Sequence, residues 1–120
     1  MEIYAILSGK GGTGKTTLAV HFAVAAELSG ERSILVDLDP QGSATHWGTS
    51  RQAETPVVVA ANPTRLADIL KTADANAVDV AVIDTAPHTD RDVYTRSPAR
   101  IAASRASLVI IRCRASIFDL

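Results

Sequence analysis

The fold of this chain is decided by one stretch, Gly9-Lys10-Gly11-Gly12-Thr13-Gly14-Lys15-Thr16-Thr17. It fits the pattern G-x-x-x-x-G-K-[ST] of a phosphate-binding P-loop. The glycines let the backbone turn sharply, so that several N–H groups converge on one anion. In this pattern Lys15 contributes a positive charge to the phosphates, and the Thr16 hydroxyl is a ligand for Mg²⁺. Residues 9–17 therefore predict a nucleotide site.

The sequence on both sides of this loop alternates apolar runs with helical patterns. Residues 3–7 form a continuous apolar run suited to a buried strand, and residues 17–29 carry a helical pattern. Further strands are predicted at residues 33–37, 56–60, 79–84 and 107–111, and further helices at residues 64–73 and 97–104. Such alternation is typical of right-handed βαβ units. We therefore expect an α/β P-loop NTPase fold, with a mostly parallel sheet flanked by helices on both faces.

The length of the chain fits one domain. Its 120 residues are predicted to form a single P-loop ATPase domain, residues 1–120. Residues 45–47 are expected in a loop or a short helix, and a further helix is expected to begin at Ser116. Because the sequence ends soon after the fifth predicted strand, we expect it to be the N-terminal portion of a longer fold that is truncated at this point.

The composition narrows the class of protein and its environment. Hydrophobic residues make up 47% of the chain and charged residues 21%, which is typical of a folded α/β domain. The net charge of −1 favours no particular charged partner. No apolar run approaches the roughly 20 residues that span a bilayer, so we expect no membrane association. Cys113 is the only cysteine, which favours a reducing, cytoplasmic location.

Three aspartates follow predicted strands. Asp84 ends the strand at residues 79–84, and Asp37 and Asp39 follow the strand at residues 33–37. The carboxyl ends of parallel strands meet at one edge of a sheet, where ligands bind. We expect Asp37 and Asp84, with Thr16, to hold the Mg²⁺ shell, and Asp39 to orient or deprotonate an attacking water. Two plainer alternatives are a solvated turn at Asp84 and a simple turn at Asp39, before Pro40.

Three segments resemble a known family. Residues 10–17 resemble the deviant Walker A motif K-G-G-x-G-K-[ST]-[ST] of the ParA/MinD ATPases, in which the first lysine, here Lys10, is distinctive. Residues 37–42, Asp-Leu-Asp-Pro-Gln-Gly, resemble switch I of the partitioning (ParA/Soj) branch. Residues 79–87 are similar to its Walker B and switch II segments, and residues 107–120 to its fifth strand and the segment that follows.

The resemblance implies a function. ParA-like proteins bind MgATP, form a dimer with ATP at the interface and hydrolyse ATP slowly. By this resemblance, Lys10 reaches the partner's nucleotide, Lys15 binds phosphate and Asp39 is critical for hydrolysis. These three residues are the expected catalytic set, and Thr16 and Asp84 match the family's metal residues. The residues expected to bind the nucleotide are Gly11, Gly12, Thr13, Gly14, Lys15, Thr16 and Thr17.

The same resemblance implies partners in the partitioning of plasmids or chromosomes. The ATP-bound dimer of the family binds DNA non-specifically, and a ParB-type adaptor stimulates its hydrolysis. One departure is Ala86, where the family usually has a proline after Walker B. Another is length, because the family's remaining strands and helices are absent. Two alternatives therefore stay open: a catalytically silent nucleotide-binding or interaction module, and a MinD-like positioning ATPase, which residues 39–42 disfavour.

Overall fold

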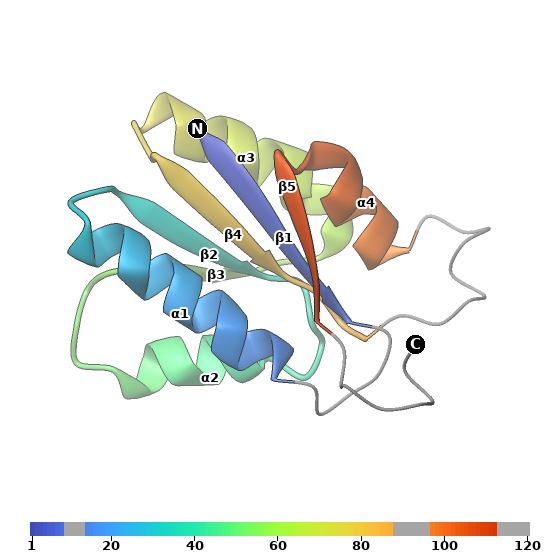
Figure 1. Cartoon of the computed structure of the whole chain (residues 1–120), viewed down its shortest axis with the longest axis horizontal. Helices are drawn as coiled ribbons and strands as arrows, with labels where there is room; N and C mark the ends of the chain where they lie inside the picture. Colours follow the sequence, from blue (N-terminus) through green and yellow to red (C-terminus); the bar gives the residue numbers. More distant parts are fainter. Residues whose placement is uncertain (9–13, 88–96, 113–120) are drawn as a thin grey trace.

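A computed structural model describes residues 1–8, 14–87 and 97–112 of the chain. Within these ranges the strands form one parallel sheet, in the order β3-β2-β4-β1-β5 (Figure 1). The prediction of an α/β fold with a parallel sheet is confirmed. The strands are β1 (Glu2–Ser8), β2 (Ser33–Asp37), β3 (Val57–Ala60), β4 (Val80–Asp84) and β5 (Leu108–Arg112).

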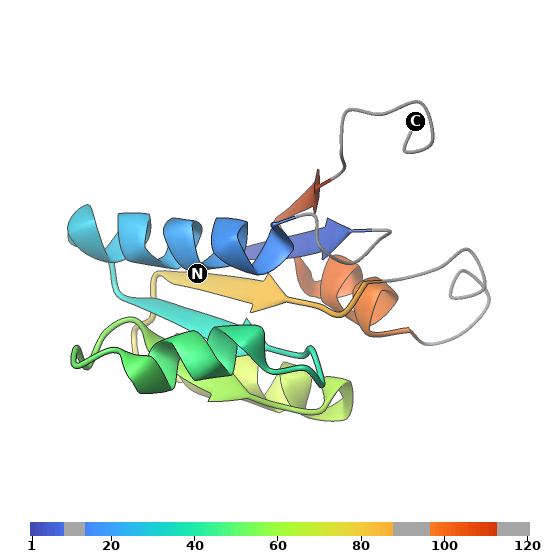
Figure 2. The same ribbon diagram turned by 90° about the horizontal axis from the view of Figure 1, so that it is seen from below.

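Helices cover both faces of this sheet. One face carries α1 (Lys15–Leu28) and α2 (Ser43–Ser50), and the other carries α3 (Leu66–Ala75) and α4 (Pro98–Arg105), as Figures 1 and 2 show. A short 3₁₀ helix, η1 (Pro63–Arg65), precedes α3. None of the helices in the described ranges is long and apolar enough to cross a bilayer.

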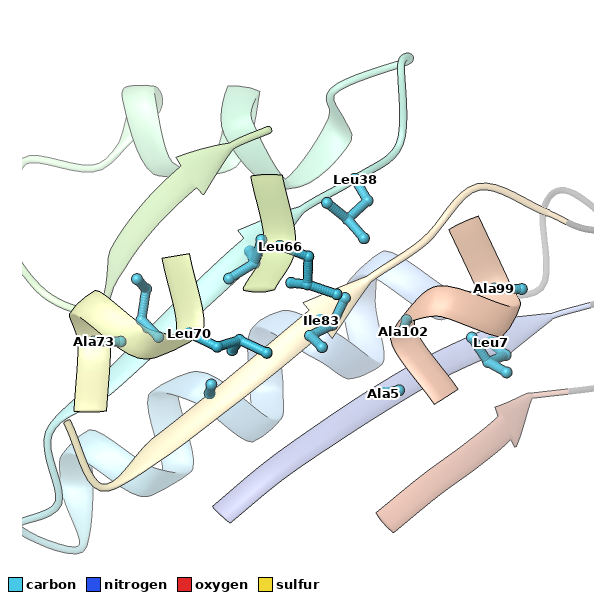
Figure 3. Packing of buried hydrophobic residues seen from close by; sticks show 12 residues of the cluster. Ala5, Leu7, Leu38, Leu66, Leu70, Ala73, Ile83, Ala99 and Ala102 are labelled. Carbon is cyan, nitrogen blue, oxygen red and sulfur yellow. The ribbon is translucent and has the colours of Figure 1, made fainter. Parts of the chain in front are cut away.

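Two buried clusters hold the layers together. Side chains alternate between the faces of a strand, so Ile6 and Leu35 pack under α1, whereas Ala5 and Leu7 pack toward α3 and α4. On the second face, Leu66 and Leu70 of α3 lie over the sheet beside Ile83 (Figure 3). Every residue of β2 and β4, two of the three inner strands, is buried. This explains why their sequences are continuous apolar runs rather than alternating ones.

The helix boundaries follow local chemistry. The predicted start of the helix at Pro98 is confirmed, because the Ser97 hydroxyl accepts a hydrogen bond from the Arg100 N–H at 3.2 Å. Gly30 has φ 85°, the left-handed conformation that favours glycine just beyond the end of α1. The helix predicted at residues 64–73 is divided into η1 and α3. The helix predicted from Ser116 lies outside the described residues.

The strand order brings the carboxyl ends of three strands together, and we call this end of the sheet its carboxyl edge. β4 lies between β1 and β2, with Ile6 paired to Asp84 on one side and Asp37 paired to Asp84 on the other. The carboxyl ends of β1, β4 and β2 therefore lie side by side. This edge, where the strand arrows end in Figure 1, is the place at which open parallel sheets bind ligands.

Candidate functional site

Lys15 is the centre of the site at this edge. It is the first residue of α1, and its ammonium group donates a hydrogen bond to Oδ1 of Asp84. The same Nζ atom lies 4.0 Å from Oδ2 of Asp39. Lys15 is only 6% exposed, so its charge is held among carboxylates rather than in water. The predicted phosphate-binding lysine and two predicted aspartates therefore lie together.

Thr16 completes the contact between α1 and β4. Its hydroxyl donates to Oδ2 of Asp84 at 2.8 Å, while Lys15 donates to the other oxygen. One carboxylate thus joins the two P-loop side chains that the sequence assigned to phosphate and metal. Two of the residues expected to hold Mg²⁺ are thus in contact, and their role as metal ligands stays a prediction.

The ionisation of Asp84 is set by its burial. The side chain is fully buried, and this desolvation raises the pKa of Asp84 above its ordinary value. The hydrogen bond and charge of Lys15 and the hydrogen bond of Thr16 oppose the rise, and the nearby charge of Asp37 adds to it. The plainer reading of Asp84 as a solvated turn is wrong, because the carboxylate has no exposed surface.

The charges at this edge suit a divalent cation. Asp39 and Asp84 lie against the Lys15 ammonium, and Asp37 adds a further buried carboxylate near Asp84. Among the described residues, these three aspartates exceed the charge of Lys15 by two when all are ionised. Within the described ranges, no group of three or more His, Cys, Asp or Glu side chains is arranged to hold a metal by itself. Mg²⁺ commonly binds through one or two protein oxygens together with phosphates and water. The Thr16 hydroxyl and the Asp84 carboxylate fit that mode.

Asp39 forms a turn and also has one carboxylate oxygen near Lys15. Its Oδ1 accepts the Gln41 N–H at 2.9 Å, and its carbonyl accepts the Gly42 N–H at 2.9 Å. These bonds make Asp39 a turn former before Pro40, as the plainer alternative had it. Its Oδ2 nevertheless lies 4.0 Å from Nζ of Lys15. The turn therefore places one carboxylate oxygen at the site.

Asp37 has partners that the sequence did not suggest. Its Oδ1 accepts the Asp39 N–H at 3.0 Å, and its Oδ2 accepts both the N–H and the hydroxyl of Thr45, at 2.9 and 2.7 Å. The carboxylate is 2% exposed and engaged with the loop and α2. Its assignment as a metal residue has no contact in its support here and stays a prediction.

Thr45 is the residue of this edge that the sequence reasoning missed. The sequence predicts a loop or a short helix at residues 45–47, and the structure has α2 there. The available signal was Gly42, because a helix that begins after glycine has no side chain of its own to cap its first turn. An earlier polar residue had to supply that acceptor, and Asp37 does so.

The first half of the P-loop lies outside the described residues. This applies to Gly9, Lys10, Gly11, Gly12 and Thr13, so the roles predicted for them stay predictions. Two later residues of the loop are described. Gly14 has φ 78° at the N-terminus of α1, a conformation that suits glycine, and Thr17 is exposed on the first turn.

Comparison with known proteins identifies the family. Residues 4–113 match the CobQ/CobB/MinD/ParA nucleotide binding domain. The chain is 43% identical over 91 residues to the maintenance of carboxysome distribution protein A of Gloeobacter kilaueensis, covering 74% of this chain and 40% of that protein. It is 30% identical over 128 residues to the sporulation initiation inhibitor protein Soj of Bacillus subtilis, covering 97% of this chain and 51% of that protein.

A solved structure supports the fold independently. The septum site-determining protein MinD of Pyrococcus horikoshii, in complex with Mg-ADP, superposes with a TM-score of 0.72 at 20% identity. That match covers 98% of this chain and 60% of the MinD chain. The chain thus spans about half the length of the curated relatives. With the P-loop side chains held against Asp84 and the family match over residues 4–113, the chain belongs to the CobQ/CobB/MinD/ParA nucleotide-binding domain family.

Proposed function

We propose that this chain is the nucleotide-binding core of a ParA-like partitioning ATPase, which binds MgATP and hydrolyses it to ADP and phosphate. The observation that carries the proposal is the cluster of Lys15, Thr16 and Asp84, with Asp39 4.0 Å from the lysine. It unites a phosphate-binding charge, a pair of metal-binding oxygens and a candidate general base at the carboxyl edge of the sheet.

Binding would begin with an exchange of partners at Lys15. Its ammonium is neutralised by Asp84 in the described geometry, and the phosphates of ATP offer it a competing set of anionic oxygens. The N-terminus of α1 adds a favourable dipole for those phosphates. Thr16 and Asp84 would hold Mg²⁺, which when bound neutralises phosphate charge and orients the phosphate groups.

Hydrolysis would depend on Asp39. Its Oδ1 is engaged by Gln41, whereas its Oδ2 faces Lys15 across 4.0 Å. In the proposed step, Oδ2 orients a water and accepts its proton as the water oxygen bonds to the γ-phosphorus. The bond between that phosphorus and the bridging oxygen of ADP breaks, and ADP leaves with the bonding electron pair.

The test of nucleotide binding compares two lysines. Lys15→Ala should weaken MgATP binding at least tenfold in isothermal titration calorimetry, because it removes the buried phosphate-binding charge. Lys71→Ala removes an exposed lysine on α3 and should leave the affinity unchanged. Equal affinity in the two variants would contradict the proposal.

Turnover separates the ATPase from a silent binding module. Asp39→Asn keeps an oxygen for the Gln41 N–H but lacks the basic carboxylate, so it should bind MgATP and release phosphate far more slowly than the wild type. A wild-type chain that binds MgATP without releasing phosphate would instead support the module.

The family resemblance extends the proposal to partners. We infer an ATP-dependent homodimer with ATP at the interface and Lys10 reaching the partner's nucleotide, stimulated by a ParB-type adaptor and able to bind DNA non-specifically. Two relatives of this chain are named for carboxysome distribution and for sporulation, so their names indicate different biological settings. The resemblance therefore supports a shared ATPase activity and favours no particular cargo.

The dimer can be tested on its own. Lys10→Ala should retain MgATP binding and lose the ATP-dependent increase in sedimentation coefficient, because the charge that would reach across the interface is gone. An unchanged sedimentation coefficient in this variant would exclude the role in the partner's site.

A further inference from the structure

The first turn of α2 is capped from a distance. Gly42 precedes the helix with φ 67° and has no side chain to accept the free N–H groups that every helix N-terminus exposes. The Asp37 carboxylate replaces that cap, since its Oδ2 accepts the Thr45 N–H at 2.9 Å and the Thr45 hydroxyl at 2.7 Å. The cap comes from the last residue of β2, a fully buried strand of the sheet.

The same carboxylate also holds the other end of the loop. Its Oδ1 accepts the N–H of Asp39 at 3.0 Å, so one buried side chain is bound to residues 39 and 45 at once. Between these two points, the Gly42 N–H donates to the Asp39 carbonyl at 2.9 Å. Residues 37–45 are thus closed into a ring of hydrogen bonds whose anchor is 2% exposed.

We propose that Thr45 is a positioning residue for hydrolysis, which holds Asp37 in the rotamer that places Asp39 beside Lys15. This inference rests on the proposed ATPase function. Two donors from Thr45 select the orientation of the Asp37 carboxylate, and that orientation aims Oδ1 at the Asp39 N–H. Loss of the hydroxyl would leave Oδ2 of Asp37 with the Thr45 N–H alone, so the carboxylate would be held less tightly. The Oδ2 of Asp39 would then be less fixed in its position near Nζ of Lys15.

The chain offers a conservative variant and a matched control. Thr45→Val removes the hydroxyl at nearly constant shape, and Thr45→Ser restores it. Thr49→Val removes the hydroxyl of a second threonine on the same helix, which donates only to the Thr45 carbonyl at 3.0 Å. Trp47, the single tryptophan, packs against the α1-side core and reports by its fluorescence whether α2 stays folded.

The first measurement is steady-state turnover of MgATP. Thr45→Val should lower kcat about tenfold while the Kd for MgATP stays within about twofold of the wild type. Thr45→Ser and Thr49→Val should keep the wild-type kcat. The wild-type Trp47 emission maximum should be retained in all three variants. A wild-type kcat in Thr45→Val would overturn the inference, and so would a parallel loss of kcat and affinity, which marks a merely structural role.

The second measurement does not depend on turnover. Amide hydrogen exchange at Asp39 should be faster in Thr45→Val than in the wild type, and unchanged in Thr49→Val. Unchanged exchange in Thr45→Val would refute the inference even if the wild type hydrolyses ATP. Conversely, a wild type without turnover contradicts the proposed function, and the role of Thr45 in hydrolysis falls with it.

Discussion

The carboxyl ends of β2 and β4 carry the same residue in the same place. Asp37 and Asp84 end neighbouring strands, are paired in register and are 2% and 0% exposed. Their partners are nevertheless different. Asp84 accepts hydrogen bonds from an ammonium and a hydroxyl of α1. Asp37 accepts them from two backbone N–H groups, one in the loop and one in α2, and from a hydroxyl of α2.

The difference shows that the segment packed over a strand end, and not the strand end itself, decides the partners of a buried carboxylate. At β4 the donors are the Lys15 and Thr16 side chains from the first turn of α1, which can leave the carboxylate by changing rotamer. At β2, two of the donors are backbone N–H groups, of Asp39 in the loop and of Thr45 in α2, which cannot leave unless the chain itself moves. Asp84 is therefore suited to exchange partners during a reaction, and Asp37 is suited to keep them.

The largest expected effect on stability comes from Asp37→Asn. The amide has one oxygen where the carboxylate has two, so its NH₂ group must face an N–H or the hydroxyl that the carboxylate accepted. A buried, charge-assisted acceptor lost in this way costs about 2 kcal/mol of the free energy of unfolding. Chemical denaturation measures the loss. A variant as stable as the wild type would show that Asp37 is not the anchor of the loop.

Asp84→Asn should have a smaller effect at neutral pH and a distinct pH dependence. Asp39 remains 4.0 Å from Lys15 as a counter-charge, and no backbone donor of α2 is left without an acceptor. Burial raises the pKa of Asp84 above its ordinary 3.8, so the unfolded chain loses this proton at a lower pH than the folded chain. The stability contributed by this residue is fully present below 3.8 and is lost as the pH rises through the folded-state pKa.

Denaturation curves of the wild type and of Asp84→Asn, measured from below pH 3.8 upward, test the direction of this pH dependence. The free energy of unfolding of the wild type, relative to Asp84→Asn, should fall as the pH rises above 3.8 and then level off. A relative stability that rises with pH over the same window would contradict the dominance of burial over the Lys15 contact. The difference in the free energy of unfolding between the wild type and Asp37→Asn, measured over the same pH values, serves as the comparison.

The smallest effect is expected at the opposite end of β4. Asp79 accepts the Arg32 N–H at 2.8 Å, but both residues are exposed and water can replace the bond. Asp79→Asn should therefore change the free energy of unfolding by less than about 1 kcal/mol. A loss as large as that of Asp37→Asn would mean that burial is not what separates these carboxylates.

Much of the fold was predictable because its signals are local. The P-loop spacing, the continuous apolar runs and the Ser97-Pro98 helix start each predict structure within a few residues, and each was confirmed where the structure describes it. The same holds for the grouping of Lys15, Thr16 and Asp84, since carboxyl ends of parallel strands share an edge. The sequence predicts one helix at residues 64–73 and misses its division into η1 and α3. A short 3₁₀ turn resembles the first turn of an α-helix in sequence.

The sequence by itself therefore determined the α/β class, the phosphate loop and the three aspartates that follow the strands. Only the tertiary structure decided which of these aspartates serves which purpose. The order β3-β2-β4-β1-β5 puts β2 beside β4, although α2, β3, η1 and α3 lie between them in the chain. The burial of the whole sheet between its helices decides both that β2 lies beside β4 and which segment packs over each strand end. The partners of Asp84 are 68 and 69 residues away in the sequence and depend on this packing. Those of Asp37 lie within eight residues of it, and Gly42 is a local sign of them.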